Sequence, residues 1–182
     1  MDFARPQDLI DAHAIQSALE AFAVRLAAQR GVSSAQSALL IQYVSAMEET
    51  AAALGTLSAD LFGRYVAVSR RFHLLMFDLA ACSVLRRHLD DGWVSPHPFF
   101  GARSLTQDRI EALRKFIVFE QDQHRSLIEA IVQRNSARAE ALAQEHARFN
   151  HRFLTALWGE KTSSMVWPHA RMQKPAEPVS TE

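Results

Sequence analysis

Apolar positions along the chain recur at the three- and four-residue spacing of helices, and no run of useful length alternates as a strand would. The segments with this spacing are bounded by capping and helix-breaking residues. We predict helices over about residues 7–30, 34–54, 58–81, 84–91, 104–134 and 136–158. Gly31 and Gly92 follow the first and fourth helices, and Ser104 with Gln107 forms a capping-box pattern at the fifth. The sequence therefore predicts an all-α protein.

The two ends of the chain differ from this helical body. Residues 159–182 contain three prolines separated by Ser, Thr and Lys, and too little apolar surface to fold alone. Residues 1–6 read as the end of a linker. We therefore expect one domain over residues 7–158, preceded by a linker-like stretch and followed by a flexible tail.

Composition narrows the possible partners and the compartment. Among 182 residues, 20 Lys and Arg balance 20 Asp and Glu, so the chain lacks a general basic field for nucleic acid. No apolar run approaches the roughly 20 residues that span a bilayer, and the first residues do not form a signal peptide. A single cysteine, Cys82, excludes an internal disulfide framework. We expect a cytoplasmic protein that binds no membrane.

Three histidines lie on the apolar stripes of three different predicted helices. His73 shares a face with Met76 and Ala80, and His124 shares one with Leu127. His146 lies in line with Phe149 in the last helix. Each helix therefore directs one imidazole toward the space between the helices.

Three stretches in this order resemble the FCD domain, the ligand-binding C-terminal half of FadR-type regulators in the GntR family of transcription factors. They are ALEAFAVRLAAQRG (Ala18–Gly31), RFHLLMFDLAACSVLRRHL (Arg71–Leu89) and DQHRSLIEAIVQRNSARAEALAQEHARF (Asp122–Phe149). The resemblance implies an antiparallel bundle of six to seven helices around a central ligand and metal pocket. It also implies a homodimer and a small-molecule effector, for which we expect an organic acid.

Many FCD domains hold a divalent metal through three histidines and an Asp or Asn. By position, the resemblance assigns the histidines to His73, His124 and His146, which suit Zn²⁺ or Ni²⁺. The carboxylate position, four residues before the first histidine, is Ser69 here. The alternative left open is that the three histidines are hydrogen-bonded core residues.

Two more positions depart from the family pattern. Gln16 replaces an arginine that can bind a carboxylate ligand, and Ser83 replaces an asparagine. With Ser69, they form a set of polar but uncharged candidate ligand-binding residues. Such a pocket either takes a less acidic effector or has lost its binding function.

The expected function is that of a sensor domain that transmits effector binding to a partner. The predicted first helix leaves no room for the family's winged-helix module in this sequence, so we expect no nucleic-acid contact by this chain itself. A small three-His metalloenzyme is one alternative, and a dimerisation module with a degenerate pocket is another. Because no recognised catalytic motif accompanies the histidines, we expect no enzyme. Glu120, one turn before His124, is the carboxylate directly beside the predicted site.

Overall fold

The computed structural model describes residues 6–53, 59–90 and 107–158, and within these ranges all the regular structure is helical. The helices are α1 (Pro6–Arg30), α2 (Ser34–Ala52), α3 (Ala59–Leu79), α4 (Ser83–Asp90), α5 (Gln107–Val132) and α6 (Ser136–Trp158). The prediction of an all-α bundle is therefore confirmed, and the helix ends agree to within two or three residues wherever both ends are described. The predicted capping serine Ser104, residues 1–5 of the linker-like stretch 1–6 and the tail lie outside the described residues, and Pro6 is the first residue of α1.

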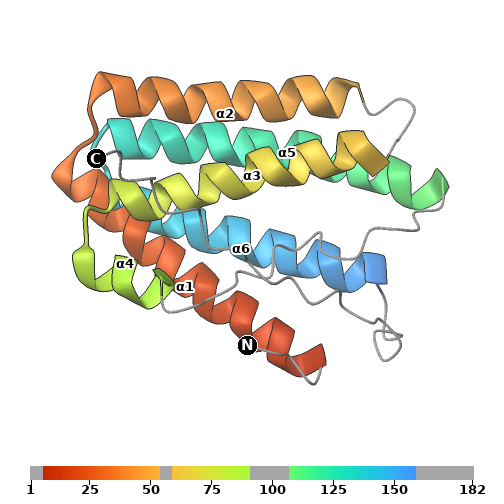
Figure 1. Ribbon diagram of the computed structural model, residues 1–182, viewed down its shortest axis with the longest axis horizontal. Coiled ribbons are helices and arrows are strands. Elements are labelled where there is room, and N and C mark those ends of the chain that lie inside the picture. Colours follow the sequence, from red (N-terminus) through yellow and green to blue (C-terminus); the bar gives the residue numbers. More distant parts are fainter. Residues whose placement is uncertain (1–5, 54–58, 91–106, 159–182) are drawn as a thin grey trace, which may run out of the picture.

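The long helices pack around a common interior, as Figure 1 shows. Helix α2 packs against α3 and α5, and α5 also packs against α6. Helix α1 crosses the bundle, with its largest contact against α6 and further contacts with α3 and α5. The short α4 contacts α3. As a result, α1, α3, α5 and α6 all border the same central region.

Helix α1 can approach its neighbours closely because its buried positions are small. Ala21, Ala23, Ala27 and Ala28 are buried there together with Val24. Small side chains bring the helix axes close and leave the space between the helices to larger residues. The other helices fill that space with fully buried large side chains, which include Leu40, Met47, Phe72, Met76, Ile117, Leu127 and Ile131.

A tight turn fixes how α5 and α6 face one another. Arg134 adopts a φ of +57°, and the N–H of Asn135 donates to the carbonyl of Ala130 at 2.9 Å, which closes the end of α5. Asn135 Oδ1 then accepts from the N–H of Arg138 at 3.1 Å and caps the start of α6. The Arg134 guanidinium donates to the carbonyl of Gln29 at 2.8 Å and ties this turn to the end of α1.

The α5–α6 turn lies so close to the end of α1 that glycine is the favoured residue there. Gly31 has a φ of +83°, and a Cβ there would lie 3.1 Å from Arg134 Nη1. The left-handed backbone and the close guanidinium both favour glycine. These contacts fix the α5–α6 hairpin relative to α1. They therefore help to set the positions of the buried polar residues on α1, α5 and α6.

Within the described residues, no helix combines the length and the apolar character needed to cross a membrane.

Candidate metal centre

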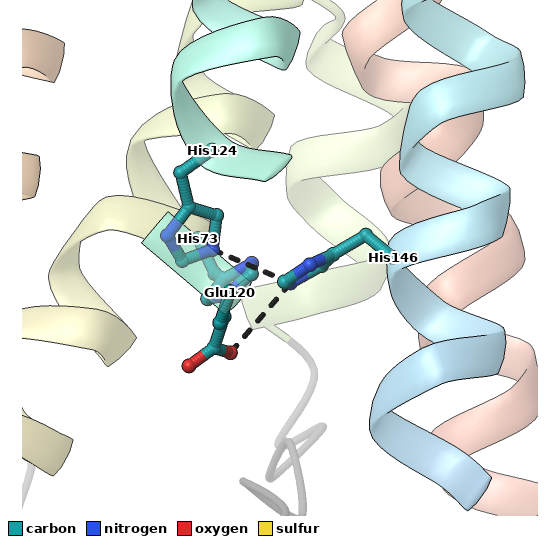
Figure 2. A group of neighbouring side chains, drawn as sticks. All are labelled: His73, Glu120, His124 and His146. Atoms are coloured by element: carbon teal, nitrogen blue, oxygen red, sulfur yellow. Dashed lines mark hydrogen bonds and ion pairs between the residues drawn. The ribbon is translucent and has the colours of Figure 1, made fainter. Parts of the chain in front are cut away.

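Four side chains that can bind a metal converge at the centre of the bundle, as Figure 2 shows. His73 comes from α3, Glu120 and His124 from α5, and His146 from α6. Each offers one potential ligand atom, and these atoms all lie within 4.8 Å of one another. The ring centroids of the histidines are 4.7–5.4 Å apart. The structure thus brings together the three histidines on which the metal prediction rests.

Each histidine has its Nδ1 next to an oxygen acceptor. His73 Nδ1 lies 2.5 Å from Glu20 Oε1 on α1. On α5 and α6, the Nδ1 atoms of His124 and His146 lie 3.2 Å from Gln121 Oε1 and 3.0 Å from Gln123 Oε1. Because a carbonyl or carboxylate oxygen only accepts, each Nδ1 carries the proton. In the neutral rings, the lone pairs are therefore on Nε2.

The orientation of the Gln121 amide follows from its second contact. Gln121 Nε2 donates to the Tyr65 hydroxyl oxygen at 3.1 Å, so its Oε1 is the atom that faces His124. The Tyr65 hydroxyl in turn donates to Glu120 Oε2. The tautomer of His124 is thus set by a hydrogen-bonded chain that ends on a carboxylate.

The spacing of the imidazole nitrogens fits a shared cation. His124 Nε2 and His146 Nε2 lie 3.3 Å apart, and both belong to buried rings. Two neutral rings with protons on Nδ1 have no hydrogen to place between these atoms, so their lone pairs repel. Ligand nitrogens about 2.0–2.1 Å from one tetrahedral zinc ion are about 3.3–3.4 Å apart. The donor set and its spacing therefore suit a metal.

Glu120 is among the largest fully buried side chains, with 1% of its surface exposed. Its Oε2 is held by Tyr65, while Oε1 lies 3.8 Å from His146 Nε2 and 3.5 Å from Asn150 Nδ2. Burial raises the pKa of Glu120 from 4.5 to about 7, against the opposing effects of the Tyr65 hydrogen bond and His73. The carboxylate therefore carries a large desolvation penalty in the metal-free protein.

The Glu20 carboxylate also acts on His73. Burial by itself lowers the pKa of this imidazole, but the charge and hydrogen bond of Glu20 outweigh it, so the pKa of His73 is raised. A carboxylate on the far nitrogen is the usual partner of a metal-bound histidine, because it orients the ring and makes the near nitrogen more basic.

The other predicted binding residues take different positions. Ser69 is fully buried one turn before His73. Gln16 is on α1 one turn before Glu20, and its Oε1 is buried without a hydrogen-bond partner among the described residues. Ser83 is exposed at the first position of α4. Ligand binding by these three residues stays a prediction.

Several residues of the site were not singled out from the sequence. Tyr65 shares the Ser69 and His73 stripe of α3, at the four-residue spacing that could have identified it. Asn150 is one turn after His146, and its Nδ2 lies 3.1 Å from His146 Nε2. Glu20, Gln121 and Gln123 gave no signal of their own, because their role depends on the relative placement of the helices.

Two comparisons with known proteins bear on this site. The sequence model of the FCD domain family matches residues 11–149, which include Glu20 and all four side chains that converge at the site. A search of curated proteins gave no significant match.

Proposed function

The chain belongs to the FCD domain family, whose members are regulatory ligand-binding domains, and from this we propose that it is the effector-binding sensor of a GntR-type transcriptional regulator. In this proposal, a divalent ion held by His73, His124 and His146 binds a small organic acid. Effector binding then shifts the bundle or its dimer between two arrangements, by the difference in affinity for the two.

The main support for a bound metal is that the three histidines share one tautomer, with the proton on Nδ1. Glu20, Gln121 and Gln123 each occupy an Nδ1, which leaves the Nε2 atoms as the metal-binding ones. In a hydrogen-bonded core, two acceptor nitrogens are not expected to face each other at a short distance. Here the two Nε2 atoms of His124 and His146 face each other at 3.3 Å, an arrangement that a bound cation stabilises.

The effector class follows from charge and from one unsatisfied acceptor. A divalent ion on neutral imidazoles keeps its positive charge and attracts a carboxylate. Gln16 Oε1, buried without a partner among the described residues, calls for a hydrogen-bond donor. We therefore propose a small acid that also carries a hydroxyl or N–H group, rather than a polycarboxylate that would need the arginine absent at this position.

The metal is tested with the full chain after chelator treatment. One equivalent of Zn²⁺ or Ni²⁺ should raise the melting temperature of the wild type, and the His124→Ala variant should lose that response. His151→Ala is the matched control, because His151 lies on α6 five residues from His146 but is exposed. A melting temperature that ignores both ions, or a His124→Ala response equal to that of the wild type, refutes the proposed site.

The effector is tested on the metal-loaded and metal-free protein in parallel. A panel of small hydroxy acids, keto acids and simple carboxylates is screened by thermal shift. We expect hydroxy acids to stabilise the metal-loaded wild type and to have no effect on the His124→Ala variant. Stabilisation that is equal with and without the metal would contradict a metal-held effector.

A further inference from the structure

We propose that Glu120 is the anionic ligand of the metal, in place of the carboxylate that is lost at Ser69. This inference rests on the proposed metal site and concerns its fourth ligand. In this proposal, the carboxylate ligand comes from α5, one turn before His124, instead of from α3, one turn before His73.

The two carboxylate oxygens of Glu120 have different partners. Tyr65 donates to Oε2 and thereby orients the carboxylate. Glu120 offers one carboxylate oxygen to the group of ligand atoms, which all lie within 4.8 Å of one another, and its Oε1 lies 3.8 Å from His146 Nε2. A carboxylate that binds a metal through one oxygen and is hydrogen-bonded through the other is a common arrangement.

The buried carboxylate of Glu120 has one short and one long hydrogen bond among the described residues. Glu120 is 1% exposed, and among the described residues its Oε1 atom has, besides His146, a long contact of 3.5 Å from Asn150 Nδ2. A buried anion with weak hydrogen bonding destabilises a fold unless a cation compensates it. A divalent ion among the three Nε2 atoms would provide that compensation.

The buried amide of Asn150 provides an independent indication. Its Nδ2 donates toward both His146 Nε2 and Glu120 Oε1, while its Oδ1 is buried without a partner among the described residues. The amide N–H₂ therefore lies between two acceptors that would otherwise repel each other. In the metal-free protein, this amide contacts the same two atoms that the proposed cation would bind.

The ligand count has a consequence for the ion. Three imidazoles and one carboxylate complete a tetrahedral shell, which would leave no position for an effector. An ion that accepts six ligands, such as Ni²⁺, keeps two positions for a carboxylate and a neighbouring hydroxyl oxygen. With Glu120 as a ligand, we expect effector binding to be stronger on the Ni²⁺ protein than on the Zn²⁺ protein.

The test measures Zn²⁺ affinity by competition with a chromophoric chelator, on the full chain. Glu120→Gln, which keeps the shape of the side chain, should weaken binding by about 100-fold or more, since loss of a ligand exceeds the 10–100-fold effect of a supporting residue. The double variant Ser69→Asp with Glu120→Gln should recover most of this affinity. Glu129→Gln on the exposed face of α5 is the control and should change nothing.

Two results overturn the assignment of Glu120. One is a Glu120→Gln variant that binds Zn²⁺ within about 3-fold of the wild type while His124→Ala loses binding, which would leave the three-His site intact without a carboxylate. The other is a double variant that binds no more tightly than Glu120→Gln. If His124→Ala also keeps its affinity, the proposed site itself fails.

A crystal structure of the Zn²⁺-loaded wild type tests whether Glu120 binds the ion and does not depend on the folding of a variant. Glu120 Oε1 within about 2.0–2.2 Å of the ion supports the proposal. An ion on the three histidines with Glu120 still held only by Tyr65 overturns it.

Discussion

Removal of the negative charge of Glu120 should stabilise the metal-free protein at pH 8. The carboxylate is buried, and its pKa of about 7 lies well above the 4.5 of an exposed glutamate. The unfolded chain therefore loses this proton at a lower pH than the folded one. At about 1.4 kcal/mol per pH unit, the difference corresponds to about 3 kcal/mol.

The sign follows from proton binding. Between pH 4.5 and about 7, the folded protein holds a proton on Glu120 that the unfolded chain has released. The free energy of unfolding must then fall as the pH rises through this window. His73, whose pKa is also raised, acts in the same direction, while the lowered pKa of the partly buried His13 opposes it in part. We therefore expect metal-free wild type to be more stable near pH 5.5 than at pH 8.

The assay is urea unfolding followed by circular dichroism, at a series of pH values with chelator present. Glu120→Gln should match the wild type near pH 5 and exceed its stability at pH 8 by about 2–3 kcal/mol, so that the two pH profiles diverge. Glu129→Gln, which alters an exposed carboxylate on the same helix, should follow the wild type. Parallel profiles for Glu120→Gln and wild type, or a less stable variant at pH 8, would refute the reasoning.

Three further predictions concern the surroundings of the site and assembly. Tyr65→Phe removes the hydroxyl that orients Glu120, and we expect metal affinity to fall by about 10-fold, measured by chelator competition; an unchanged affinity would show that this hydrogen bond does not position the carboxylate. Glu20→Gln should lower the pKa of His73, measured by NMR titration, because the carboxylate charge that offsets the pKa-lowering effect of burial is removed. An unchanged pKa would contradict the ion pair between Glu20 and His73. We also expect a homodimer in sedimentation velocity, and a monomer throughout the micromolar range would argue against it.

Much of the fold was predictable because helices are encoded by local patterns. The apolar spacing, together with Gly31 after the first helix, placed the helix ends to within a few residues. The three histidines could be selected from eight because each lies on an apolar stripe and because the resemblance to FCD domains indicates the same positions. Local periodicity shows that His124 points inward, and in the structure it is fully buried.

The partners of the histidines could not be predicted in the same way. Glu20 contacts His73 across 53 residues of sequence, and the contact depends on how α1 crosses α3. Glu120 lies on the stripe of His124, but the stripe does not show that Tyr65 holds one oxygen of that carboxylate while the other lies 3.8 Å from His146 Nε2. The serine at position 69 suggested a site without a carboxylate, whereas the packing places one there from another helix.

The most direct test of the metal site is X-ray absorption spectroscopy of the full chain loaded with one equivalent of Ni²⁺ or Zn²⁺. We predict a shell of nitrogen and oxygen ligands at roughly 2.0–2.2 Å, with the multiple-scattering signal of three imidazoles. The His124→Ala variant should not retain the ion through desalting. A shell made only of oxygen, or one with a single imidazole, would contradict a metal held by His73, His124 and His146.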